Sequence, residues 1–430
     1  MMFIKSHMTF EKSHHQSQIQ ASDAQAAQLF TQGQYQQALN QNQVTVNLIG
    51  HNTAETHLNF AACYSRIFEP ELAVHHFSQY MKLSHSQTVW DIRRLSDYHA
   101  QANQIDQAFD IVCNQQHDCA EKHLDLSWHL FRQHRYEQAF REMDHGKRQG
   151  NILWIGQERW DNLPQCDRWQ DQDLLDKRVC IVGECGLGDE FIFARWIATL
   201  LKKHPTTQFY YYTNNTISHV IMRNFDVAPH QADNQYHFWI PSMSLPLMAQ
   251  YYDPTVTQAY IKPDPVYVKK WKSLLGNQRV ISLSWTGSTQ YSENHFRDIP
   301  VEYLVEKLKD RYTLVSVCME ALTCPDGVWD LTPQIKTWED TLAILSLSEI
   351  VLCSCSSVSH AAGSLGVKTF VYTRPDDYFT WGGTLSGEKT VWYPDVTVWR
   401  KSRMGQWQLP INQSLLQWKK IAISPKWPYN

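Results

Sequence analysis

Val182-Gly183-Glu184-Cys185-Gly186-Leu187-Gly188-Asp189-Glu190 joins a short apolar run, residues 178–182, to a helical pattern that extends to Lys203. Glycines let the backbone turn sharply and approach a ligand, and the N-terminus of the following helix favours an anion. The stretch predicts a strand, a ligand-binding turn at Gly186 and Gly188, and a helix with Asp189 in its first turn. Asp189 also fits a simpler role, because an acid at a helix start interacts favourably with the helix dipole.

The glycine order separates this turn from that of nicotinamide enzymes. It is G-x-x-G-x-G rather than G-x-G-x-x-G, and the next strand-like segment, residues 208–213, lacks the acid that binds ribose. A dinucleotide-dependent oxidoreductase or epimerase is therefore not expected.

Apolar strand-like runs alternate with helical patterns on both sides of a segment that contains Pro263 and Pro265. Such alternation predicts parallel sheets with helices on both faces, here as two doubly wound lobes that bind ligands at the carboxyl ends of their strands. The expected strands are 178–182, 208–213, 280–285, 313–317, 349–353 and 368–372, and the expected helices are 190–203, 301–309, 338–347 and 357–365.

A second polar segment follows the strand 280–285. Trp285 and Thr286 stand at the strand end, and Arg297 follows in a loop that leads to a helix. These three residues are expected to face the cleft, where an arginine suits a diphosphate, although a solvated loop arginine is the alternative.

A third segment, residues 353–366, again ends a strand and begins a helix. The hydroxyls of Ser356 and Ser357, with free backbone N–H groups, predict an anion site. His360 lies one turn further and is expected to look back to the cleft, although a lone histidine is more often structural. No G-x-S-x-G nucleophile motif occurs in the sequence.

The first part of the chain has a different period. Four similar short segments carry Ala38, Ala73, Ala108 and Ala139, separated by 35, 35 and 31 residues. This spacing is typical of stacked helical hairpins, in which a small residue lets paired helices approach closely. An irregular helical bundle is the alternative. Either arrangement predicts a helical region over residues 21–150 that contacts a partner.

The remaining boundaries follow from composition. Residues 1–20 are polar and are expected to be disordered or poorly ordered, and 151–176 to form a linker lying against the lobes. The lobes are expected at 177–265 and 266–430.

The net charge of −4 over 430 residues does not suggest a nucleic-acid partner. No apolar run suggests a signal peptide or a transmembrane segment, and the ten cysteines lack any C-x-x-C pair, so a cytoplasmic protein is expected.

Together these segments resemble the heptosyltransferase-like glycosyltransferases, family nine of the sugar transferases, in the bacterial proteins where that module follows tetratricopeptide repeats (TPR). The resemblance spans roughly residues 160–400. Its matching segments are Pro164 with Trp169, Gly183–Arg195, Pro241–Pro246, Trp285–Gly287, Arg297–Pro300 and Cys355–Gly366.

The resemblance implies an α + α/β chain: a TPR-like helical repeat followed by two Rossmann-like lobes, the GT-B fold. It implies inverting transfer from a nucleotide-diphosphate sugar, of hexosyl, heptosyl or GlcNAc type, without a metal or another cofactor. The acceptor, a protein or a glycan, is expected to be held partly by the repeats. Asp189 matches the general base. The donor and its phosphates would be bound by Gly186, Gly188, Trp285, Thr286, Arg297, Ser356, Ser357 and His360.

One position departs from the family pattern. Cys355 stands where the family has an acid. The departure keeps a second hypothesis open, in which the chain is a non-catalytic TPR scaffold with a degenerate GT-B module.

Overall fold

The computed structural model describes residues 2–213, 216–232, 235–291, 294–374, 379–382, 386–401 and 406–423. They divide into two compact units, the first ending at Gln133 and the second beginning at His134. In the described parts, no helix is long and apolar enough to cross a membrane.

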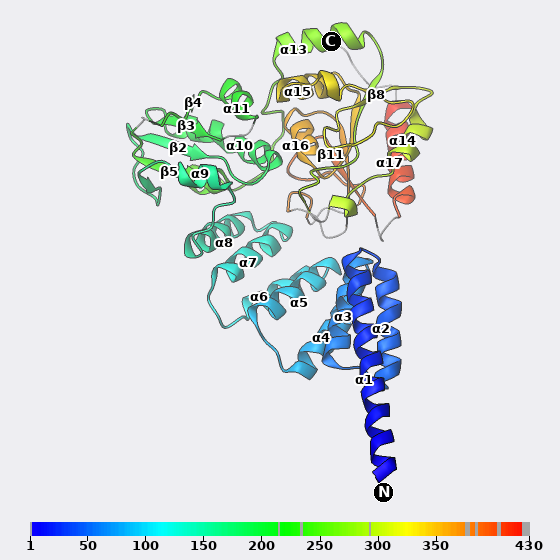
Figure 1. Cartoon of the computed structure of the whole chain (residues 1–430). Helices are drawn as coiled ribbons and strands as arrows, with labels where there is room; N and C mark the ends of the chain where they lie inside the picture. Colours follow the sequence, from blue (N-terminus) through cyan, green and yellow to red (C-terminus); the bar gives the residue numbers. More distant parts are fainter. Residues whose placement is uncertain are drawn as a thin grey trace. The chain divides into compact units, whose positions relative to one another are not determined.

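The first unit consists of helical hairpins (Figure 1). Ala38, Ala73 and Ala108, with Ala139 of the next helix, are all 0% exposed, as close helix packing requires. Each of these alanines follows by five positions a residue with left-handed backbone: Gly33, Phe68, Asn103 and His134. The repeated turn supports the repeat hypothesis over an irregular bundle. The helices are α1 (Met2–Thr31), α2 (Tyr35–Ile49), α3 (Ala54–Arg66), α4 (Pro70–Ser84), α5 (Val89–Gln101), α6 (Ile105–Cys113) and α7 (Ala120–Arg132).

Residues 2–20, in the segment expected to be disordered or poorly ordered, belong to helix α1, which begins at Met2. Residues 2–31 contain no glycine or proline, so nothing in them interrupts a helix. Ser22 also anchors α1 to α2, since its Oγ accepts hydrogen bonds from Gln41 and Thr45, each at 2.8 Å.

The second unit begins with α8 (Tyr136–Gln149) and contains both sheets. The first sheet is parallel, in the order β1-β5-β2-β3-β4. The lobe built on this sheet contains α9 (Gln157–Asp161), β1 (Asp167–Arg168), β2 (Arg178–Val182), α10 (Leu187–Lys203), β3 (Gln208–Tyr212), α11 (Ser218–Asn224), β4 (Ala228–Pro229), β5 (Phe238–Pro241), η1 (Ser242–Ser244) and α12 (Leu245–Ala249).

The second sheet is also parallel, in the order β11-β10-β9-β6-β7-β8. Its lobe contains α13 (Pro265–Leu275), β6 (Val280–Ser284), η2 (Asn294–Phe296), α14 (Val301–Leu308), β7 (Thr313–Ser316), β8 (Trp329–Asp330), η3 (Thr332–Gln334), α15 (Trp338–Ser346), β9 (Ile350–Ser354), α16 (Ser357–Ser364), β10 (Thr369–Thr373), β11 (Val396–Arg400) and α17 (Gln408–Ile423). The expected architecture, helical hairpins followed by two Rossmann-like lobes, is confirmed.

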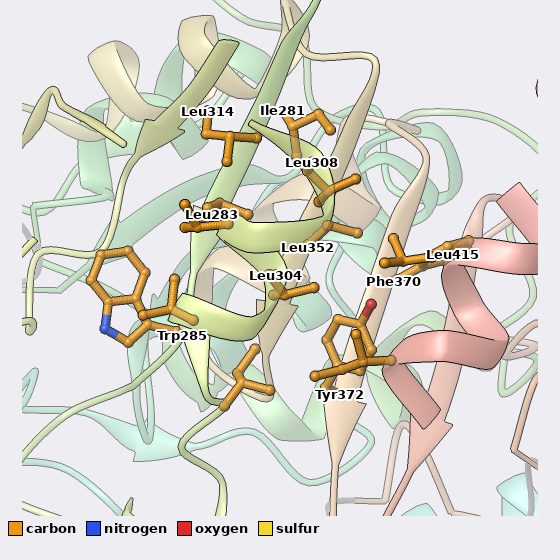
Figure 2. Packing of buried hydrophobic residues seen from close by; sticks show 14 of the residues in the cluster. Ile281, Leu283, Trp285, Leu304, Leu308, Leu314, Leu352, Phe370, Tyr372 and Leu415 are labelled. Carbon is orange, nitrogen blue, oxygen red and sulfur yellow. The ribbon is translucent and has the colours of Figure 1, made fainter. Parts of the chain in front are cut away.

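Fully buried strands explain why these segments are almost continuously apolar, because a parallel sheet covered on both faces exposes neither side. In the second lobe, Leu304 and Leu308 of α14 lie by Leu352 of β9, and Leu415 of α17 lies beside Phe370 of β10, all in one buried cluster (Figure 2). This core fixes the strand ends from which the polar segments emerge.

Two boundaries differ from the sequence-based ones. The segment 151–176 is not only a linker, because β1 pairs with β5 at the edge of the first sheet. Helix α8, expected to close the repeat region at residue 150, groups with the lobes. The physical reason is that α8 contributes buried charges to the first lobe, as described below.

Candidate functional site

The turn between β2 and α10 is tightly held. Cys185 has left-handed backbone, with φ of 57°. Asp189 lies in the first helical turn, and its Oδ2 accepts a hydrogen bond from the Gly186 N–H at 3.1 Å. This contact is the helix-start role that the sequence left open for Asp189, and it holds the partly exposed carboxylate beside the glycine turn.

The start of α10 lies against the start of α16 from the other lobe. A Cβ on Gly188 would be 2.8 Å from Cδ2 of His360 and 3.5 Å from Cα of Ser357. Only glycine therefore permits this approach. Two of the three sequence segments, 170 residues apart, meet here with two helix N-termini, each a source of free N–H groups and partial positive charge.

Among the described residues, several buried hydroxyl groups at or after the carboxyl ends of β9 and β10 lack hydrogen-bond partners. Within the described part of the chain, the Oγ atoms of Ser354 and Ser356 and the Oγ1 atoms of Thr373 and Thr380 are buried without a hydrogen bond. Ser354 ends β9 and Thr373 ends the neighbouring β10. Buried polar groups normally have partners, so these atoms point to a ligand or water. The sequence motifs do not single out Ser354, Thr373 or Thr380, although Ser354 and Thr373 end their strands and carry that signal.

Arg297 joins the second segment to the third. Its Nη1 donates to the Cys355 carbonyl at 2.8 Å and its Nε to Asn294 Oδ1 at 2.8 Å. Asn294 in turn donates to Thr286 Oγ1 at 2.7 Å. Arg297 and Thr286 thus lie at the strand ends, where the sequence predicted them.

Trp285 is placed differently from the expectation that it faces a cleft. Its side chain belongs to the hydrophobic core of the second lobe and the residue is 9% exposed (Figure 2). The reason is strand alternation: Trp285 follows Leu283 by two positions and shares its core-facing side.

His360 is buried and neutral. Its Nδ1 lies 3.0 Å from the Tyr393 hydroxyl, and its ring stacks on Trp381 with centroids 4.9 Å apart. Burial, with a smaller effect of the Arg195 guanidinium, lowers the pKa of His360 to about 3. The imidazole therefore carries no charge near pH 7, and any part it plays toward a phosphate is that of a neutral group.

Arg195, quoted above only as part of the motif Gly183–Arg195, holds the lobes together. It donates to the carbonyls of Ile192, Pro254 and Trp392 at 2.8, 2.5 and 2.8 Å. Tyr260 and Tyr393 rings also flank it, at 5.0 and 4.9 Å. No carboxylate in the described residues pairs with it. A buried cation without an anion raises the positive potential around it, and the guanidinium contributes to the lowered pKa of His360.

A second group that the sequence did not single out is Glu190, one residue after Asp189. It is fully buried and accepts hydrogen bonds from Tyr211 at 3.0 Å and Thr213 at 2.9 Å. These bonds tie α10 to the end of β3, so Glu190 fixes the helix rather than facing a ligand.

Comparison with known proteins gives remote likenesses. No family model matches the chain. The protein FlbA of Caulobacter vibrioides is 22% identical over 304 residues, which cover 60% of this chain and 49% of FlbA. This chain therefore spans about half the length of that curated relative.

Three solved structures are similar in fold. A family 9 glycosyl transferase of Veillonella parvula has a TM-score of 0.40 at 12% identity, covering 59% of this chain and 92% of its own. ADP-heptose heptosyltransferase II of E. coli has a TM-score of 0.37 at 10% identity, and the match covers 56% of this chain and 99% of the E. coli chain. An O-GlcNAc transferase of Thermobaculum terrenum has a TM-score of 0.31 at 11% identity, and the match covers 95% of this chain and 94% of the other chain. TM-scores this low support no statement about activity.

Proposed function

We propose that this chain is a glycosyltransferase that moves a sugar from a nucleotide-diphosphate sugar to a protein or glycan acceptor, without a metal and with inversion. The observation that carries the proposal is the meeting of the α10 and α16 N-termini at Gly188 and His360. Two helix starts from different lobes suit a diphosphate, and Arg297 lies at the same strand ends.

The unpartnered hydroxyls support a polar ligand at this edge. Ser354, Ser356 and Thr373 can exchange hydrogen bonds with phosphate oxygens or sugar hydroxyls. Arg297 and the helix starts would stabilise the charge that develops on the departing diphosphate.

Asp189 is the proposed general base. In the reaction, the acceptor oxygen bonds to the anomeric carbon while the bond from that carbon to the diphosphate oxygen breaks. The acceptor hydroxyl proton passes to the Asp189 carboxylate, and the nucleoside diphosphate leaves with the bonding pair. Asp189 Oδ2 already accepts from Gly186, which keeps the carboxylate at the turn.

Asp189→Asn tests this role. Its amide oxygen can still accept from Gly186, so the turn is kept, whereas the base is lost. We expect a decrease in turnover of about 10²–10⁴-fold at an unchanged melting temperature. Unchanged turnover with an identified acceptor would refute the assignment.

A non-catalytic scaffold is the second candidate, favoured by Cys355. Its Sγ accepts from Trp381 Nε1 at 3.1 Å, so the family's acid is replaced by a group engaged in packing. Thermal shift against a panel of UDP-, GDP- and ADP-sugars separates the candidates, because a ligand of the folded state raises the melting temperature. No shift and no donor hydrolysis in the parent, with activity gained in Cys355→Asp, would favour the scaffold.

A further inference from the structure

We propose that Lys147 of α8 is a positioning residue for the turn between β2 and α10, so that the last helix of the repeat pattern is a working part of the site. This inference rests on the proposed function. Lys147 acts through Glu184, which lies in that turn two residues before Gly186.

Lys147 and Glu184 form a fully buried ion pair. Both side chains are 0% exposed, and Lys147 Nζ lies 2.5 Å from Glu184 Oε2. Lys147 Nζ also lies 5.1 Å from the centre of the Trp154 ring. Glu184 Oε1 has no hydrogen-bond partner in the described part of the chain, and Oε2 also accepts from the Met243 N–H at 3.4 Å. Among the described residues, Lys147 is the cation in direct contact with this carboxylate.

The same stretch of chain holds the turn at two further points. The Trp154 carbonyl accepts from the Cys185 N–H at 2.7 Å. Arg159 Nη1 donates to the Gly183 carbonyl at 2.5 Å. Residues 147–159 therefore fix three consecutive positions of the turn, including the left-handed Cys185.

Helix α8 is itself anchored to the first lobe. Asp144 accepts from Arg168 at 2.5 Å and from Ser244 Oγ at 2.6 Å. Arg148 donates to the Trp169 carbonyl at 2.8 Å. These contacts hold the Lys147 ammonium in place beneath the turn.

Stability alone does not account for the pair. Replacing a buried ion pair with apolar groups of similar size is often neutral or stabilising, whereas removing one partner is strongly destabilising. An apolar pair would not be directional. The ion pair fixes the position of the Glu184 carboxylate, and with it the conformation of the turn that carries Gly186 and Asp189.

The experiment separates position from stability with two variants of the full chain. Lys147→Met leaves the Glu184 charge unpaired and should lower the melting temperature. Lys147→Met combined with Glu184→Leu removes both charges and should recover it. Lys270→Met is the control for losing a paired lysine away from the turn: half-exposed Lys270 pairs with Asp340 in the other lobe at 2.6 Å, and Trp271 still bonds that carboxylate.

Turnover and amide exchange are the readouts. In the double variant, turnover should stay about 100-fold low and exchange across residues 183–189 should be about tenfold faster despite the recovered melting temperature. Parent-like turnover and exchange in the double variant would overturn the inference. If the parent transfers no sugar, only the proposed function fails, and the exchange rates still decide whether Lys147 positions the turn.

Discussion

Gly188→Ala tests the meeting of the two lobes. The new Cβ would lie 2.8 Å from Cδ2 of His360. Carbon atoms pack best from about 3.5 Å, so the contact is too short by roughly 0.7 Å. The ring cannot retreat freely, because it stacks on Trp381 and is bonded to Tyr393. Overpacking of this kind costs about 1–3 kcal/mol, and we expect a loss near 2 kcal/mol in the free energy of unfolding.

Urea denaturation followed by tryptophan fluorescence measures this loss. Most of the 17 tryptophans lie in the second unit, so the signal mainly reports its unfolding. Gly156→Ala is the control, since nothing lies within 4 Å of its added Cβ, and should cost less than about 0.5 kcal/mol. Combining Gly188→Ala with His360→Ala removes the clashing ring, so the two changes should couple by about 1–2 kcal/mol. No coupling, or a cost no larger than that of the control, would contradict the contact.

Three more outcomes are expected. Arg195→Met should lower the free energy of unfolding by at least about 3 kcal/mol, because three carbonyls lose a charged donor; the exposed Arg141→Met should cost under about 1 kcal/mol in the same urea titration. The loss of stability caused by His360→Gln should shrink as pH falls below 6.5. The folded-state pKa of His360 is lowered to about 3, so its contribution to stability is full above pH 6.5 and is lost on acidification. Melting temperatures of parent and variant from pH 4 to 8 check this, and a pH-independent difference would refute it. A chain starting at residue 134 should fold, whereas one starting at residue 160 should not. The shorter chain loses all of α8 and the bonds of residues 154 and 159 to the turn, in addition to the about 3–5 kcal/mol for leaving Glu184 buried and unpaired; circular dichroism and gel filtration compare the two.

The local patterns determined most of the fold. The apolar runs near 178–182, 280–285 and 349–353 are strands, and the helices after them begin close to the expected residues. Such elements are readable because burial of a parallel sheet demands continuous apolar residues, and glycines and hydroxyls mark where each strand ends. The alanine spacing likewise predicted the hairpins, because a helix pair packs closely only around a small side chain.

Tertiary structure decided what each polar residue does. The sequence could not show that Gly188 meets His360, that Trp285 turns into the core, or that Arg195 is buried between the lobes. These outcomes depend on which faces are brought together by elements far apart in the chain. Nor could the repeat pattern show that α8 leaves the other hairpins to join the lobes. The sequence of α8 matches a repeat helix, but the buried partners of its Lys147 and Asp144 belong to the first lobe. Because an unpaired buried charge is strongly destabilising, these ion pairs hold α8 against that lobe.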